Sequence, residues 1–171
     1  SSFGVLSAAS VIVLGDESGY IDGENQKFKL AAIEAMWETE PAPASFTLVG
    51  WPDREARETH FAVEIPYVLG LIATRSLDKE VAGIEDLVEQ AKLRIVNGIA
   101  AYDALQRIRE NPEDAAAQEA FAATRTDLGH GLLLTRFVED PREATQAQID
   151  AAADSLVPNV ALTFWGFRFM V

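Results

Sequence analysis

The chain contains no cysteine, and only two of its 171 residues are histidines. The lack of cysteine excludes disulfides, thiolate metal sites and a cysteine nucleophile, but leaves the redox compartment open. His60 and His130 lie far apart in the sequence without neighbouring metal ligands, so we interpret both as surface or core residues. The sequence also lacks a phosphate-binding Gly-Lys-Ser/Thr loop and a Gly-x-Ser-x-Gly nucleophile motif. We therefore do not expect this segment alone to be a complete enzyme.

Positive charge is scarce. There are 14 Lys and Arg residues against 27 Asp and Glu residues, a formal net charge of −13. A surface this acidic repels phosphate backbones, which excludes nucleic acid as a partner. The acidic stretch 16–22 does not match a calcium-binding loop, because Tyr20 replaces an oxygen ligand and Ile21 replaces the turn glycine. The 49% share of hydrophobic residues argues against disorder throughout.

The two ends of the chain are apolar, but neither run reaches the roughly 20 residues that cross a bilayer. Residues 1–15 carry no charge and lack the basic leader of a signal peptide. We predict that 1–15 is the end of one transmembrane helix and that 158–171 is the start of the next. The chain would then be an extramembrane loop of a larger membrane protein. The alternative is a soluble domain with two terminal core helices.

Between these ends the pattern predicts a mainly α fold, a small helical bundle with one β-hairpin. We expect a first helix over 24–38, with Asp22 as N-cap and Pro41 and Pro43 ending it. Alternating apolar residues over 44–67 predict a hairpin, with a long loop that begins at Trp51.

Three further helices follow in the second half of the chain. Apolar residues at three- and four-residue steps predict a helix over 83–109, and an Ala-rich helix is expected over 113–125. Residues 145–156 form the third, with capping-box spacing between Thr145 and Gln148. Pro158 stands where a following helix would begin. We divide the chain into 1–15, 16–80, 81–157 and 158–171.

Several segments, in the same order, resemble subunit I of the cytochrome bd quinol oxidases, and the similarity spans essentially the whole chain. The matching segments are GDESGY at 15–20, QKFKLAAIEAMWET at 26–39, PAPA at 41–44, IPYVLGLIATRS at 65–76, DLGHGLLL at 127–134 and FRFMV at 167–171. The resemblance places the chain at the large extracytoplasmic Q-loop, together with the ends of the flanking membrane helices. It implies that 16–80 is the more mobile half of this loop and 81–157 the more rigid half.

The resemblance implies a quinol-oxidation site at Lys29 and Glu34, with Asp16 as a weaker candidate. Quinol loses two protons as it loses two electrons, so a carboxylate within reach is a suitable proton acceptor. An ammonium group can stabilise negative charge that develops on a quinone oxygen. On a regular helix, however, Lys29 and Glu34 point about 140° apart. The helix is therefore distorted, or the two side chains reach the ring from different sides. Without the resemblance, both residues would be read as surface charges.

The resemblance also implies haem cofactors. Met170 matches an axial ligand of the low-spin b-type haem, and Arg168 lies close to that haem. The opposing His ligand and the high-spin b and d haems are expected outside this chain, so the fragment alone should not retain haem.

The activity implied for the intact complex is electron transfer from quinol to dioxygen in the bacterial cytoplasmic membrane, with the loop on the periplasmic side. The implied partners are quinol, the remainder of subunit I, subunit II, an optional small accessory subunit and the membrane. The alternative is a non-catalytic helical interaction module of another membrane protein. Whether ubiquinol or menaquinol is the substrate stays open.

Overall fold

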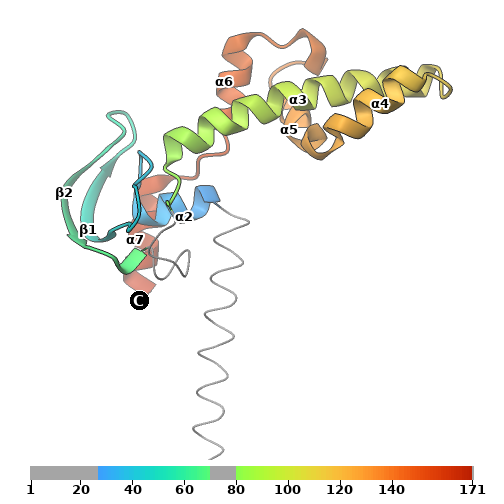
Figure 1. The fold of residues 1–171 in the computed structure, drawn as a ribbon. Helices are drawn as coiled ribbons and strands as arrows, with labels where there is room; N and C mark the ends of the chain where they lie inside the picture. Colours follow the sequence, from blue (N-terminus) through green and yellow to red (C-terminus); the bar gives the residue numbers. More distant parts are fainter. Residues whose placement is uncertain (1–26, 70–79, 171) are drawn as a thin grey trace, which may run out of the picture. The chain divides into compact units, whose positions relative to one another are not determined.

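The structure is a computed structural model that describes residues 27–69 and 80–170 (Figure 1). The predictions for residues 1–15, Asp16 and Asp22 lie outside this part. Short 3₁₀ turns cover Arg125–Asp127, Leu133–Arg136 and Pro141–Glu143. The helices and strands are α2 (Lys27–Glu34), β1 (Phe46–Asp53), β2 (Glu58–Ile65), α3 (Ile84–Glu110), α4 (Ala115–Thr124), α5 (Leu128–Leu132), α6 (Gln146–Asp154) and α7 (Val160–Met170). The predicted fold class, mainly α with one β-hairpin, is confirmed.

The chain divides into two compact units. The first contains the described residues up to Leu87 together with those from Val157 onward, and so holds α2, the hairpin and α7. The second, Val88–Leu156, holds most of α3 with α4, α5 and α6.

Helix α2 is shorter than predicted, because it ends at Glu34 and not at the prolines. Ala35 adopts a left-handed backbone conformation with φ of 50°. The Ala35 N–H donates to the Ala32 carbonyl at 3.2 Å, and the Met36 N–H donates to the Ala31 carbonyl at 2.9 Å. This is the Schellman arrangement, which ends helices by satisfying carbonyls of the last turn. Pro41 and Pro43 therefore lie well beyond the true helix end.

The hairpin is confirmed, but its loop is shorter than expected. Strand β1 continues through Trp51 and Pro52, which pair with His60 and Thr59, so the connection is confined to residues 54–57. The register shifts between Thr47 and Trp51. Because of these irregularities, the apolar residues near the end of β1 do not alternate regularly, and the strand extends beyond the predicted end.

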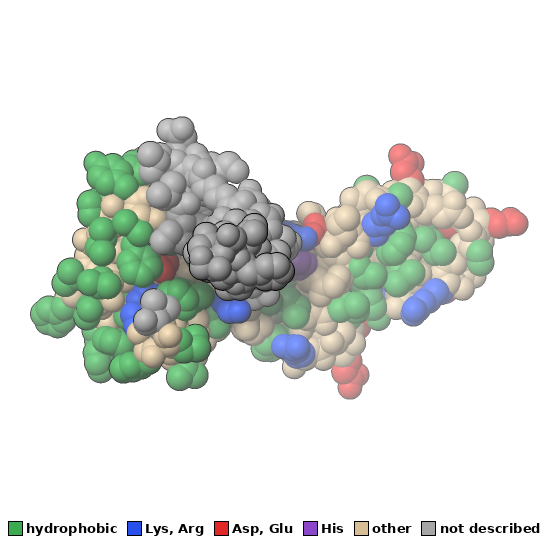
Figure 2. All heavy atoms as spheres, turned by 90° about the horizontal axis from the view of Figure 1, so that it is seen from below, with side chains coloured by type: hydrophobic (Ala, Val, Ile, Leu, Met, Phe, Trp, Pro, Cys, Tyr) green, Lys and Arg blue, Asp and Glu red, His purple; other side chains and the backbone are tan. Residues whose placement is uncertain are grey.

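Large apolar side chains remain exposed on the hairpin. Figure 2 shows hydrophobic side chains gathered over the part of the molecule that contains the hairpin and α7. Phe61 is 91% exposed and Trp51 66% exposed. Phe61 also has a left-handed φ of 53°, an unusual conformation for an aromatic residue.

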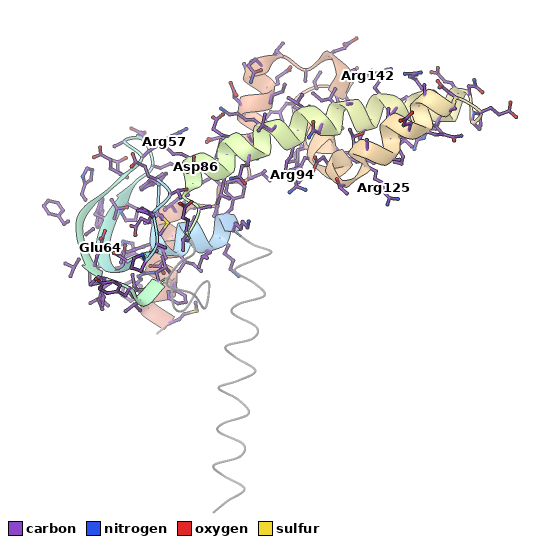
Figure 3. The ribbon with its side chains drawn as sticks, viewed as in Figure 1. Arg57, Glu64, Asp86, Arg94, Arg125 and Arg142 are labelled. Carbon is purple, nitrogen blue, oxygen red and sulfur yellow. The ribbon has the colours of Figure 1, made fainter. Side chains whose placement is uncertain are left out.

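Hydrogen bonds fasten the hairpin to the chain around α2. The Thr59 hydroxyl donates to the Ala35 carbonyl at 2.8 Å and accepts from the Trp37 indole at 3.2 Å. Near the start of α3, Arg57 forms an ion pair with Glu85 at 3.4 Å, and the Thr39 hydroxyl donates to Asp86. Arg57 and Asp86 are labelled in Figure 3. The core of this unit includes a cluster of buried apolar side chains, Met36, Ala44, Leu69 and Val81.

The helices predicted for the second half are confirmed with small shifts. Helix α4 begins after Asp114, whose side chain accepts from the Ala117 N–H. The capping box of Thr145 and Gln148 is present at the start of α6. The chain between α4 and α6 was not predicted to be helical, but it forms α5 and the 3₁₀ turns.

Helix α7 begins later than Pro158 suggested. The Asn159 side chain accepts from the Leu162 N–H at 3.0 Å, so Asn159 caps the helix and Val160 is its first residue. Within the first unit α7 packs against α2 and β1, and its Val160 and Phe164 side chains are buried.

Candidate functional site

Glu34, a predicted quinol-site residue, is buried at the C-terminal end of α2. Only 3% of the residue is exposed, and it is one of two buried polar or charged residues in the described part. Its Oε2 atom accepts a hydrogen bond from the Thr47 N–H of β1 at 3.3 Å. A buried carboxylate is costly unless it is paired, so the residue needs a cation nearby.

Arg168 of α7 supplies that cation. Its Nη2 atom lies 3.0 Å from Glu34 Oε2, and the side chains are 10% and 3% exposed, respectively. Nη1 donates to the Ile33 carbonyl and Nη2 to the Thr47 carbonyl. One guanidinium therefore binds α2, the Glu34 carboxylate and β1 together.

Three phenylalanine rings surround the Arg168 guanidinium. Its Cζ lies 4.2 Å from the ring centroid of Phe164, 4.9 Å from that of Phe46 and 5.6 Å from that of Phe167. Aromatic rings attract a cation through their negative faces, and the attraction is stronger where water is excluded. The cluster of Glu34, Arg168 and these rings thus holds one buried ion pair within apolar walls.

Burial raises the pKa of Glu34 above its ordinary value, since a carboxylate loses its hydration inside the protein. The charge of Arg168, its hydrogen bond and the Thr47 N–H oppose this effect, and the net direction is still upward. A carboxylate with a raised pKa is a better proton acceptor near neutral pH than an ordinary surface glutamate.

Lys29 does not join this cluster. Its side chain is exposed on α2, and among the described residues it makes no hydrogen bond or ion pair with Glu34 or Arg168. The exposure of Lys29 and the burial of Glu34 agree with the different faces that their five-residue spacing predicts. If one quinol ring contacts both groups, the Lys29 and Glu34 side chains must reach it from different faces of α2. Asp16 lies outside the described residues.

Met170 is 81% exposed at the end of α7, beside Phe169, which is 84% exposed. The thioether therefore lies outside the core that the described residues form. The Arg168 Nε atom is buried without a hydrogen-bond acceptor in the described part of the chain. The exposed thioether and the unsatisfied buried donor two residues before it both fit a group that the described residues do not supply, and thioethers are known haem-iron ligands.

Neither histidine is a member of this cluster. The His60 Nε2 atom lies 3.8 Å from the Asp53 carboxylate at the exposed hairpin. His130 belongs to the second unit, where burial lowers its pKa. Over residues 27–69 and 80–170, no group of three or more His, Cys, Asp and Glu residues could hold a metal ion.

The pairing of Glu34 with Arg168 was missed from the sequence, because the residues are 134 positions apart. One signal pointed to it. Arg168 is the only charged residue within 158–171, and a lone charge in an apolar stretch requires a partner. The partner itself could not be chosen from the sequence.

The comparisons with known proteins identify the family. A family model described as cytochrome bd terminal oxidase subunit I matches residues 1–171. The chain belongs to this family. It is also 41% identical over 171 residues to the cytochrome bd-II ubiquinol oxidase subunit 1 of Escherichia coli strain K12. The match covers 100% of this chain and 33% of that protein, so the chain spans about a third of the length of this relative.

Membership in the cytochrome bd subunit I family confirms the resemblance and contradicts the alternative of a module from another kind of membrane protein. Among the helices that the structure describes, none is long and apolar enough to cross a membrane. The ends of membrane helices over 1–15 and 158–171 remain predictions.

Proposed function

We propose that this chain is the quinol-oxidising Q-loop of a cytochrome bd-type oxidase. The intact complex would transfer electrons from quinol to dioxygen, and this loop would lie on the periplasmic side of the cytoplasmic membrane. Residues 16–80 and 81–157 would form its two halves, between the membrane-helix ends at 1–15 and 158–171. The net charge of −13 is compatible with the outer side, since excess Lys and Arg favour the cytoplasmic side.

The observation that carries the proposal is the buried Glu34 carboxylate at the end of α2. Its raised pKa suits acceptance of a quinol proton, and α2 also carries Lys29, an exposed donor for a quinone oxygen. We assign Glu34 as the proton acceptor, Lys29 as the group that binds the quinol oxygen and Asp16 as an additional binding residue. The relative in E. coli is named a ubiquinol oxidase, so ubiquinol is the first substrate to test.

Met170 is the residue that would hold the low-spin b-type haem, with a His ligand from outside this chain and Arg168 nearby. The haem would accept electrons from quinol. The high-spin b and d haems, subunit II, the rest of subunit I and an optional small accessory subunit would complete the complex.

The test is ubiquinol oxidation by the full-length oxidase carrying Lys29→Ala or Glu34→Gln. Lys27→Ala and Glu38→Gln are matched controls, because both residues are exposed charges near the same positions. We expect raised KM or lost quinol activity in the first pair, normal kinetics in the controls, and normal oxygen reduction with an artificial donor throughout. Unchanged quinol kinetics in both Lys29→Ala and Glu34→Gln would contradict the site assignment.

A further inference from the structure

We infer that Arg168 is a positioning residue of the quinol site, acting as a cap that α7 supplies to the C-terminal end of α2. This inference rests on the proposed function, because α2 carries Lys29 and Glu34. It assigns to Arg168 a role that is separate from its expected proximity to a haem.

The last carbonyl groups of α2 need hydrogen-bond donors from outside the helix. The final turn of a helix leaves its carbonyls without partners inside the helix. The Schellman arrangement satisfies the carbonyls of Ala31 and Ala32. The Ile33 carbonyl is satisfied by Arg168, from a position 135 residues later in the chain. The cap of α2 is thus completed by a tertiary contact.

Helix α2 also depends on its contact with Arg168. The last turn of α2 contains no basic residue to favour the helix dipole. Arg168 places a positive charge at the C-terminal end, where the dipole favours one. The position of α2 is therefore set by its packing on α7 and by this guanidinium.

The planar shape of the Arg168 guanidinium also matters. The Ile33 carbonyl, the Glu34 carboxylate and the Thr47 carbonyl all accept from the two terminal nitrogens of Arg168. A planar guanidinium can hold acceptors in fixed directions, whereas a lysine ammonium is a compact charge on a flexible stem. Lysine at this position would keep the charge and lose the simultaneous grip on α2 and β1.

The consequence concerns Lys29, which is exposed and has no hydrogen-bond partner among the described residues. Since no described residue holds its side chain, we expect the placement of Lys29 to follow the placement of α2. Loosening the C-terminal end of α2 should therefore weaken quinol binding through the displacement of Lys29.

The experiment uses the full-length oxidase with Arg168→Lys and Arg168→Gln, and with Arg57→Gln as control. Arg57 belongs to the same unit and forms an ion pair, but half of its side chain is exposed. Both Arg168 variants should raise the KM for ubiquinol about tenfold, the change that corresponds to one lost charge-assisted hydrogen bond. Hydrogen exchange of the Ala35 and Met36 amides should accelerate in both, and Arg57→Gln should change neither quantity.

A different result in Arg168→Lys would contradict the positioning role. If Arg168→Lys leaves the KM and the exchange of these amides as in the parent, and alters only the haem absorption spectrum, Arg168 serves the haem and the inference is wrong. Arg168→Gln leaves Glu34 without its cation. If that variant does not fold, the KM and the amide exchange of Arg168→Lys alone test the inference. Failure of the proposed function has a different signature. In that case Lys29→Ala and Glu34→Gln both leave the KM unchanged, while faster amide exchange in Arg168→Lys still supports the cap on α2.

Discussion

Replacement of Gly98 by alanine should destabilise the second unit, although alanine is the better helix former. A Cβ atom at Gly98 in α3 would lie 2.3 Å from the Gly131 nitrogen of α5 and 2.4 Å from the Asp127 carbonyl oxygen. Both are backbone atoms, so neither can rotate away. Overpacking costs about 1–3 kcal/mol, and backbone neighbours place this case at the upper end. The higher helix propensity of alanine than of glycine offsets about 1 kcal/mol of this cost. The net expectation is about 2 kcal/mol of destabilisation.

Hydrogen exchange on the full-length oxidase measures this change locally. Amides over 94–102 should exchange about 30-fold faster in Gly98→Ala, since 1.4 kcal/mol corresponds to a factor of ten. The matched control is Gly129→Ala, also in a helix, where an added Cβ meets nothing within 4 Å. That variant should exchange at the parent rate or up to about fivefold more slowly, because alanine restricts the unfolded chain. If Gly98→Ala is as well protected as Gly129→Ala, the close approach of α3 and α5 is refuted.

Three further predictions concern single residues, each read by hydrogen exchange in the intact oxidase. Glu34 has a raised pKa, so its stabilising effect is complete below its ordinary value of 4.5 and is lost as the pH rises through the raised value. Glu34→Gln should remove this pH-dependent loss, and an identical pH profile in the variant would contradict the burial argument. Thr145→Ala removes the capping box of α6 and should cost about 1 kcal/mol, whereas equal protection of α6 would show that the cap is dispensable. Phe164→Ala should cost about 3–5 kcal/mol near α7, because Phe164 is fully buried, and a cost below that of Thr145→Ala would argue against this packing.

The helical second half of the chain was largely readable from sequence, because its signals are local. The apolar steps of α3 and the Thr145–Gln148 capping box depend on residues three or four positions apart. The hairpin was also predicted, yet its irregular register hid the strand end at Asp53. The helical turns over 125–136 were missed because they are too short for a periodic pattern to develop.

The candidate site shows the same division. The sequence singled out Lys29, Glu34, Arg168 and Met170 through the resemblance to the cytochrome bd family, and it anticipated that Lys29 and Glu34 face different ways. It described Glu34 and Arg168 as separate functional residues. The structure joins them in one buried ion pair, which was outside the reach of any local pattern.

The sequence by itself therefore determined the family, the helical character and the residues that merit testing. Tertiary structure alone decided where α2 ends, which cation neutralises Glu34 and which carbonyl Arg168 caps. The physical reason is that the apolar face of a helix and a capping box both depend on residues that are close together in the sequence. A buried charge, in contrast, is satisfied by whichever partner the packing of distant elements brings within hydrogen-bonding distance.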